Sequence, residues 1–183
     1  MFSRFFRRDR QSGRIASALY GVIVAQARLP DFYARLGVPD TVDGRFEMIV
    51  AHLGLVLRRL READAETMEL GQEVFDLFCT EMDRSLREMG VGDLAVPKRM
   101  RRMAEAYYGS AAAYDSALDS GDRAALADAV RRNLFRGAPG GADAIAAYLM
   151  ETADRLKSTP LADVRSGRLV WPDPLGARLG SVA

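Results

Sequence analysis

The sequence has few of the residues that build disulfides and metal centres. Among 183 residues it contains one cysteine, Cys79, and one histidine, His52. A single cysteine forms no internal disulfide and no cysteine-based zinc site, so the chain carries no sign of an oxidising compartment. A single histidine without companion ligands is expected to have a structural role rather than to bind haem or a metal. We therefore expect no metal and no cofactor.

Long apolar runs and strand patterns are also missing. No stretch approaches the roughly 20 consecutive apolar residues that a membrane-spanning helix needs. The first ten residues, MFSRFFRRDR, lack the apolar region of a secretory signal. No segment shows the sustained alternation of apolar and polar residues that indicates a strand. The sequence therefore predicts a cytoplasmic protein without a sheet.

Catalytic signatures are not found either. The stretch GVGD at 90–93 has neither the spacing nor the Lys-Ser/Thr ending of a phosphate-binding loop. The nucleophile motif G-x-S-x-G is absent. Cys79 lies beside Phe78 on an apolar stripe, where burial disfavours a reactive thiolate. A protein that is not an enzyme is the expectation.

Helical periodicity fills most of the chain. Hydrophobic residues make up 49% and charged residues 28%, with a net charge of +1, as in a soluble globular protein. Apolar residues recur at three-and-four spacing in six segments, bounded by turn or cap residues such as Ser12, Gly90 and Asp122: 12–30, 46–60, 68–89, 97–118, 122–134 and 142–156. We predict a single compact all-α domain of about six helices over 12–183, preceded by a basic aromatic arm at 1–11. The proline-broken C-terminal tail is expected to be irregular, with Leu169 and Trp171 laid onto the helices.

One stretch, LREMGVGDLAVPKRM at 86–100, stands out from the plain helices around it. Gly90 is placed to end one helix with a positive φ, which a β-branched residue tolerates poorly. Asp93 and Pro97 are placed to shape the start of the next helix. The pattern predicts a helix–turn–helix corner, which we interpret as a binding corner with Glu88 facing the partner.

Two blocks of the sequence resemble the ubiquinol–cytochrome c chaperone family, the assembly factors for cytochrome b of the respiratory bc1 complex. They are VAQARLPDFYARLGVPDTVDGRFEMIVAHL at 24–53 and EMDRSLREMGVGDLAVPKRMRRMAEAYYGSAAAY at 81–114, about half of the chain. The alanine- and arginine-rich character is similar to that of a bacterial member. The positions that match the family motifs are Arg28, Phe32, Tyr33, Asp40, Arg45, Phe46, Asp83, Arg87, Glu88, Gly90, Gly92, Asp93, Lys98, Tyr108 and Gly109.

The resemblance implies a non-enzymatic chaperone that holds newly made cytochrome b, or its nascent chain, while haem is inserted and partner subunits arrive. It also implies two further partners, the ribosome and a small partner protein. The family brings no catalytic residues. An apolar floor with a charged rim would suit such a client, and the candidate client-binding residues are Phe32, Tyr33, Asp40, Arg45, Phe46, Asp83, Arg87, Glu88, Asp93, Tyr107 and Tyr108. Ordinary core packing is the alternative for the aromatic members, above all for Phe46 and Tyr107.

Two basic runs offer a surface for anionic partners. If KRMRR at 98–102 is helical, its cations face outward and Met100 faces inward. The arm MFSRFFRRDRQSGR interleaves five arginines with three phenylalanines. Attraction to anionic lipid or ribosomal RNA is one interpretation, and a merely solvated basic face is the other. We expect the arm to be mobile without a partner and to aid peripheral contact with the inner face of the membrane. The candidates are Arg4, Arg7, Arg8, Arg10, Lys98, Arg99, Arg101 and Arg102.

Two other functions remain open on the sequence. A helical ribosome- or RNA-binding module without a cytochrome client would use the same basic runs. A small haem-binding helical protein is a third possibility, weakened by the single histidine.

Overall fold

The computed structural model describes residues 2–176, with side chains from residue 13 onward, and this part of the chain is helical without a strand. The all-α prediction is confirmed. Six long helices match the six periodic segments, and two helices of five residues, α2 and α8, join them. The helices are α1 (Phe2–Ala27), α2 (Pro30–Ala34), α3 (Val42–Arg61), α4 (Ala65–Glu88), α5 (Val96–Ser120), α6 (Arg123–Asn133), α7 (Ala142–Ser158) and α8 (Leu161–Arg165).

The first helix begins earlier than the sequence pattern indicated. Its backbone starts at Phe2 rather than at Ser12, because residues 2–11 contain no glycine or proline and arginine is a good helix former. The side chains of the arm, those of Arg4, Arg7, Arg8 and Arg10 among them, lie outside the described residues. The division into an arm at 1–11 and a domain at 12–183 stays a prediction.

Side-chain caps fix the starts of three helices. Thr41 accepts a hydrogen bond from the backbone N–H of Gly44, Asp64 from that of Thr67, and Asp122 from that of Ala125. Each cap satisfies a backbone donor that the first turn of a helix leaves unpaired. Asp122 is the cap that the sequence pattern predicts.

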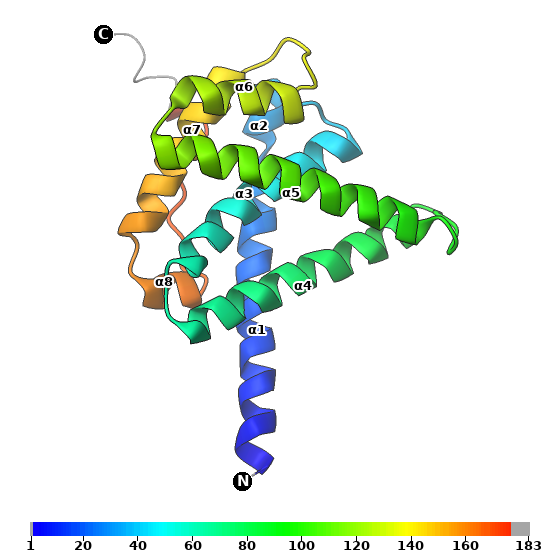
Figure 1. Cartoon of the computed structure of the whole chain (residues 1–183), viewed down its shortest axis with the longest axis vertical. Coiled ribbons are helices and arrows are strands. Elements are labelled where there is room, and N and C mark those ends of the chain that lie inside the picture. The colour runs from blue at the N-terminus through cyan, green and yellow to red at the C-terminus, as the bar shows by residue number, and fades with distance from the viewer. Residues whose placement is uncertain (1, 177–183) are drawn as a thin grey trace.

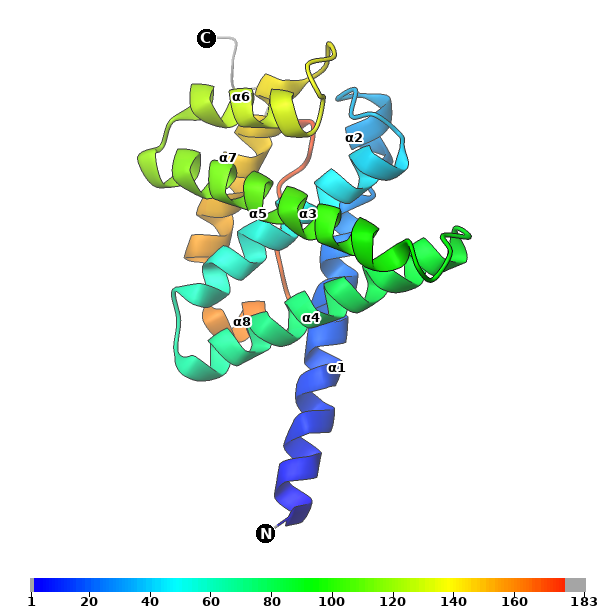
Figure 2. The same cartoon turned by 45° about the vertical axis from the view of Figure 1, so that its right-hand side comes forward.

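The helices pack around α3, which contacts α1, α4, α5 and α7. Figures 1 and 2 show α1 as a rod that crosses the body and leaves it at one end, while α4 and α5 form a hairpin whose corner projects to another side. The chain after α8 runs back along the body, and Leu169 and Trp171 pack against the core as expected. The buried indole Nε1–H of Trp171 has no hydrogen-bond partner in the described structure, and its ring lies 5.4 Å from that of His52 between centroids.

A buried polar network joins α1, α3 and α7. His52 Nδ1 lies 2.7 Å from the carbonyl oxygen of Met48, and its Nε2 lies 2.8 Å from the hydroxyl of Tyr148. Because a carbonyl oxygen only accepts, Nδ1 carries the proton and Nε2 accepts from Tyr148. The Tyr148 oxygen in turn accepts from Gln26 Nε2 at 3.0 Å. Burial lowers the pKa of His52 to about 4, so the ring is neutral, as a structural histidine would be.

The Tyr148 network gives a first test. Tyr148→Phe leaves Gln26 Nε2 and His52 Nε2 without partners in a dry site, and we expect it to lower the free energy of unfolding by about 1–3 kcal/mol. Tyr33→Phe is the matched control, because the Tyr33 hydroxyl donates to the Ala27 carbonyl at a half-buried position that water reaches. Urea unfolding of both variants measures the difference. Equal losses would contradict the structural role of the network.

Candidate binding surface on the α4–α5 hairpin

The predicted corner between α4 and α5 is confirmed. The α4 helix ends at Glu88, Met89 follows as its C-cap, and Gly90 has a φ of +79°. The N–H of Val91 donates back to the carbonyl of Leu86 at 3.1 Å, which closes the helix end. A residue with a Cβ would be strained at this φ, so the reversal of the chain depends on glycine.

Arg87 ties the corner to α4. Its Nε donates to Asp83 Oδ2 at 2.6 Å, one turn earlier, and its Nη1 donates to Asp93 Oδ1 at 2.5 Å, across the corner. The hydrogen bond to Asp83 raises the pKa of the Arg87 guanidinium. Asp93 and Glu88 are well exposed, and Glu88 pairs with Arg84 at 3.2 Å. Such exposed pairs shape the surface more than they stabilise the fold.

Five rings from α3, α4 and α5 form one group, called here the aromatic cluster: Phe46, Phe75, Phe78, Tyr107 and Tyr108. Its inner rings, Phe46, Phe78 and Tyr107, are buried. Phe75 is half-buried, and its ring centroid lies 5.0 Å from that of Tyr107 and 6.3 Å from that of Tyr108. Tyr108 is 62% exposed. The cluster therefore presents an aromatic edge, Phe75 with Tyr108, to solvent.

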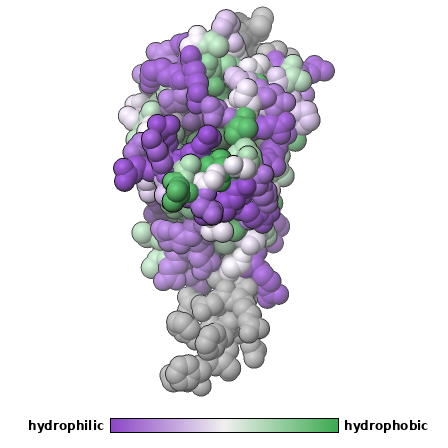
Figure 3. Space-filling model, turned by 90° about the vertical axis from the view of Figure 1, so that its right-hand side faces the viewer, coloured by the Kyte–Doolittle hydropathy of each residue, from purple (hydrophilic) through white to green (hydrophobic). Residues whose placement is uncertain are grey.

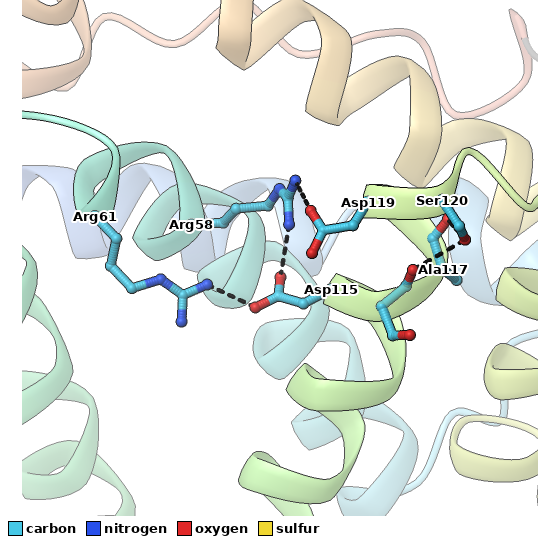
Figure 4. A network of polar contacts seen from close by, with 7 residues as sticks. Arg58, Arg61, Asp115, Ala117, Asp119 and Ser120 are labelled. Atoms are coloured by element: carbon cyan, nitrogen blue, oxygen red, sulfur yellow. Dashed lines mark hydrogen bonds and ion pairs between the residues drawn. The ribbon is translucent and has the colours of Figure 1, made fainter.

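Ion pairs fasten the far end of α5 across α3. Arg58 Nη2 lies 2.5 Å from Asp119 Oδ1, and Arg61 Nη2 lies 2.6 Å from Asp115 Oδ2 (Figure 4). The other terminal nitrogen of Arg58, Nη1, lies 3.6 Å from Asp115 Oδ1. These contacts fix the direction of α5, so that its first half, with Tyr108, extends along α4 toward the corner.

A buried carboxyl group holds the middle of the same crossing. Glu47 on α3 accepts a hydrogen bond from Ser110 Oγ of α5 at 3.1 Å. Burial raises the pKa of Glu47 to about 7, and the hydrogen bond from Ser110 opposes that rise only in part. Near neutral pH this carboxyl group is therefore partly protonated inside the fold.

The candidates of the first sequence block gather at the start of α3. Arg45 Nε lies 2.6 Å from Asp40 Oδ1, and the Arg45 guanidinium stands over the ring of Tyr33, 5.4 Å from its centroid. Arg45 lowers the pKa of Asp40 through this hydrogen bond, and burial raises the pKa of Tyr33. Tyr33 is half-buried while Asp40 and Arg45 are exposed, so this small group reaches the surface.

Three aromatic candidates lie in the core instead of on an accessible floor. Phe32 has no exposed surface and packs edge-on against the rings of His52 and Tyr148, at 5.5 and 5.0 Å between centroids. Phe46 and Tyr107 are inner members of the aromatic cluster. These positions agree with ordinary core packing, the alternative given for the aromatic candidates: a short helix, α2, turns Phe32 inward, and the stripes of α3 and α5 face the core. Their role in client binding stays a prediction.

Phe75 is the surface aromatic that the sequence did not single out. It lies on the apolar stripe of α4, and a helical stripe does not say which of its members is at the edge of the contact. Only the position of α5 leaves one side of Phe75 open. Its spacing to Phe78 and Met82 is that of any member of the stripe and does not indicate that Phe75 is exposed.

The basic run on α5 has the predicted geometry. Lys98, Arg99, Arg101 and Arg102 are exposed, while Met100 and Met103 pack against the core. None of the four cations has a hydrogen bond or ion pair to another described residue.

No metal site or membrane span is present in the part of the chain that the structure describes. The side chains of residues 13–176 bring together no group of three or more histidine, cysteine or acidic residues that could hold a metal. None of the described helices combines the length and the apolar character needed to cross a bilayer. Burial raises the pKa of the Cys79 thiol, which keeps it protonated.

The chain is similar to a known protein family, to a named relative and to a solved structure. Residues 34–171 match the profile of a family described as "Ubiquinol-cytochrome C chaperone". The ubiquinol-cytochrome-c reductase complex assembly factor 1 of Xenopus laevis is 24% identical over 120 residues, which are 66% of this chain and 60% of that protein. The crystal structure of the Cbp3 homolog from Brucella abortus is similar with a TM-score of 0.85 and 37% identity, over 96% of this chain and 99% of that one.

The matched region contains most of the candidate residues. It includes the α4–α5 hairpin, the aromatic cluster and the Asp40–Arg45 pair. Phe32 and Tyr33 lie just before it. The match spans less than two thirds of the length of the Xenopus relative.

The buried carboxyl group of Glu47 gives a pH-dependent prediction. Because the pKa of Glu47 is higher in the folded chain than its usual 4.5, the folded state retains a proton that the unfolded state loses, and stability falls as pH rises from about 4.5 to 7. Glu47→Gln cannot ionise and keeps an oxygen to accept from Ser110. We expect the variant to gain about 2–3 kcal/mol relative to the wild type between pH 4.5 and pH 8.

Urea unfolding at the two pH values measures this gain. The contribution of His52 is common to both proteins and cancels in the difference. A gap between variant and wild type that stays constant with pH would show that Glu47 titrates normally.

Proposed function

This chain belongs to the ubiquinol-cytochrome C chaperone family, and we propose that it is a non-enzymatic chaperone that binds newly made cytochrome b during assembly of ubiquinol–cytochrome c reductase. The family match over 34–171, supported by 37% identity to the Brucella Cbp3 homolog across 96% of this chain, carries the proposal. The Xenopus relative is named as an assembly factor of this complex. We propose the same role for this chain.

The chemistry of the α4–α5 hairpin supports such a client. A newly made membrane protein exposes apolar helix surface before its partners arrive, and aromatic side chains supply large contact area at low conformational cost. The aromatic edge of Phe75 and Tyr108 is of this kind. The paired charges of Asp83, Arg87 and Asp93 lie farther along the hairpin, where they would form a polar rim.

The rigidity of the edge also favours binding. Phe75 and Tyr108 rest on the buried rings of Phe78 and Tyr107, so little side-chain freedom is lost when a partner helix covers them. Glu88 remains a candidate contact on the rim, with Arg84 as its present partner. Asp40, Arg45 and Tyr33 form a second candidate contact at the start of α3.

The further partners are part of the same proposal. We place the protein at the cytoplasmic face of the membrane, where a nascent cytochrome b chain emerges from the ribosome. A small partner protein would be a second ligand. The exposed cations of α5 would favour a ribosome or an anionic membrane nearby, by attraction to phosphate groups.

Gene deletion followed by complementation tests the client. We expect deletion to lower spectrally detected cytochrome b and assembled complex, while unrelated membrane proteins stay at normal levels. Complementation with Tyr108→Glu should restore only part of the cytochrome b signal, because a charge replaces the exposed ring. Val170→Glu is the matched control, since Val170 is an equally exposed apolar residue outside the hairpin.

Thermal unfolding of the purified variants checks that both fold. Normal cytochrome b in the deletion strain would refute the client. Full restoration by Tyr108→Glu would refute the aromatic edge as the contact.

A further inference from the structure

The corner between α4 and α5 ends in aliphatic side chains that no described residue covers. Leu94 is 99% exposed and Met89 is 51% exposed. Figure 3 looks onto the side toward which the hairpin projects and shows a small hydrophobic area ringed by hydrophilic residues. A single exposed leucine is common on proteins, so the surroundings of this pair decide its meaning.

Charges of both signs lie around this corner, and the basic side chains outnumber the acidic ones. The four acidic residues Glu81, Asp83, Glu88 and Asp93 are paired with Arg84 or Arg87. Lys98, Arg99, Arg101 and Arg102 are exposed and make no ion pair within the described structure. Residues 81–102 therefore hold four acidic and six basic side chains, a net charge of +2, and the positive excess lies on the α5 side of Leu94.

The distances along the hairpin suit the interface of a bilayer. With a rise of 1.5 Å per residue, the exposed cations from Lys98 to Arg102 span about 6 Å along α5. Amphipathic surfaces enter the headgroup region of a membrane by roughly 5–10 Å. The corner projects from the body in both ribbon views, so the rest of the molecule leaves room for a flat surface there (Figures 1 and 2).

We propose that this corner docks on an anionic lipid surface, with Leu94 and Met89 inserted among the headgroups and Lys98, Arg99, Arg101 and Arg102 bound to lipid phosphates. The aliphatic residues favour lipid over RNA, because RNA recognition would place aromatic rings or guanidinium planes against the bases. The cytochrome client is assigned to the aromatic edge of Phe75 and Tyr108 and to its polar rim, whereas the lipid contact uses Leu94, Met89 and the four cations of α5. The two surfaces can therefore be tested apart.

Co-sedimentation of the full chain with lipid vesicles tests this inference. The vesicles are phosphatidylcholine alone or phosphatidylcholine with about 30% phosphatidylglycerol, at low and high salt. We expect wild-type protein to bind the anionic vesicles at low salt and to be released at high salt. Leu94→Ser and the double variant Arg101→Gln, Arg102→Gln should each weaken this binding about tenfold or more.

Matched controls come from other faces of the chain. Val170→Ser removes an exposed apolar residue, and the double variant Arg123→Gln, Arg132→Gln removes two exposed cations from α6. Both controls should bind vesicles as the wild type does. All variants retain residues 1–11, so any contribution of the N-terminal arm is common to them.

Three results would overturn the inference, and a fourth would support it while separating it from the client function. Wild-type binding by Leu94→Ser would mean that nothing inserts. Equal losses in the controls would mean that binding depends on net charge alone. Binding to ribosomal RNA could exceed vesicle binding at the same salt and be unchanged by Leu94→Ser. That result would assign the basic face to RNA. Loss of vesicle binding by Leu94→Ser with normal cytochrome b assembly would leave the lipid site standing and separate it from the client function.

Discussion

The hydroxyl group of Tyr148 is the point at which three helices are fixed to one another. It donates to His52 of α3 and accepts from Gln26 of α1, so the rotation and height of α1, α3 and α7 are specified together. A buried group that loses its partner has no water to replace it, which makes any shift of one helix costly. Phe32 covers one side of this site and Trp171 lies against the His52 ring, so two segments far apart in the sequence pack onto the same network.

The α4–α5 hairpin extends from these packed helices, and its inner and outer ends are held by different contacts. Its inner end is held to α3 by the Arg58, Asp115 and Asp119 pairs and by the Glu47–Ser110 hydrogen bond. At its outer end Leu86 and Val96 are buried, and Arg87 joins Asp83 to Asp93 beside the turn at Gly90. The aromatic edge thus lies on a rigid part of the hairpin, which suits a contact with a partner helix. The corner lies on a part that other elements do not cover, which suits contact with an extended surface.

The two titratable groups of the core act on stability in opposite directions. The raised pKa of Glu47 makes the folded state less stable as pH rises from about 4.5 to 7. The lowered pKa of His52, about 4, makes the folded state less stable as pH falls from 6.5 toward 4. Between pH 4.5 and 6.5 the contributions of these two groups to stability have opposite slopes and largely offset each other.

The sequence by itself determined the helices, the corner and the outward face of the basic run. These features depend on residues near one another in the chain: apolar spacing, a glycine at a helix end and the alternation of Met100 and Met103 with cations. It did not determine that Phe32 is buried or that Phe75 and Tyr108 form an exposed edge. Only the tertiary structure decided these, because a stripe of apolar residues fixes which side of a helix is buried, whereas the neighbouring helix fixes which ring of that stripe is left uncovered.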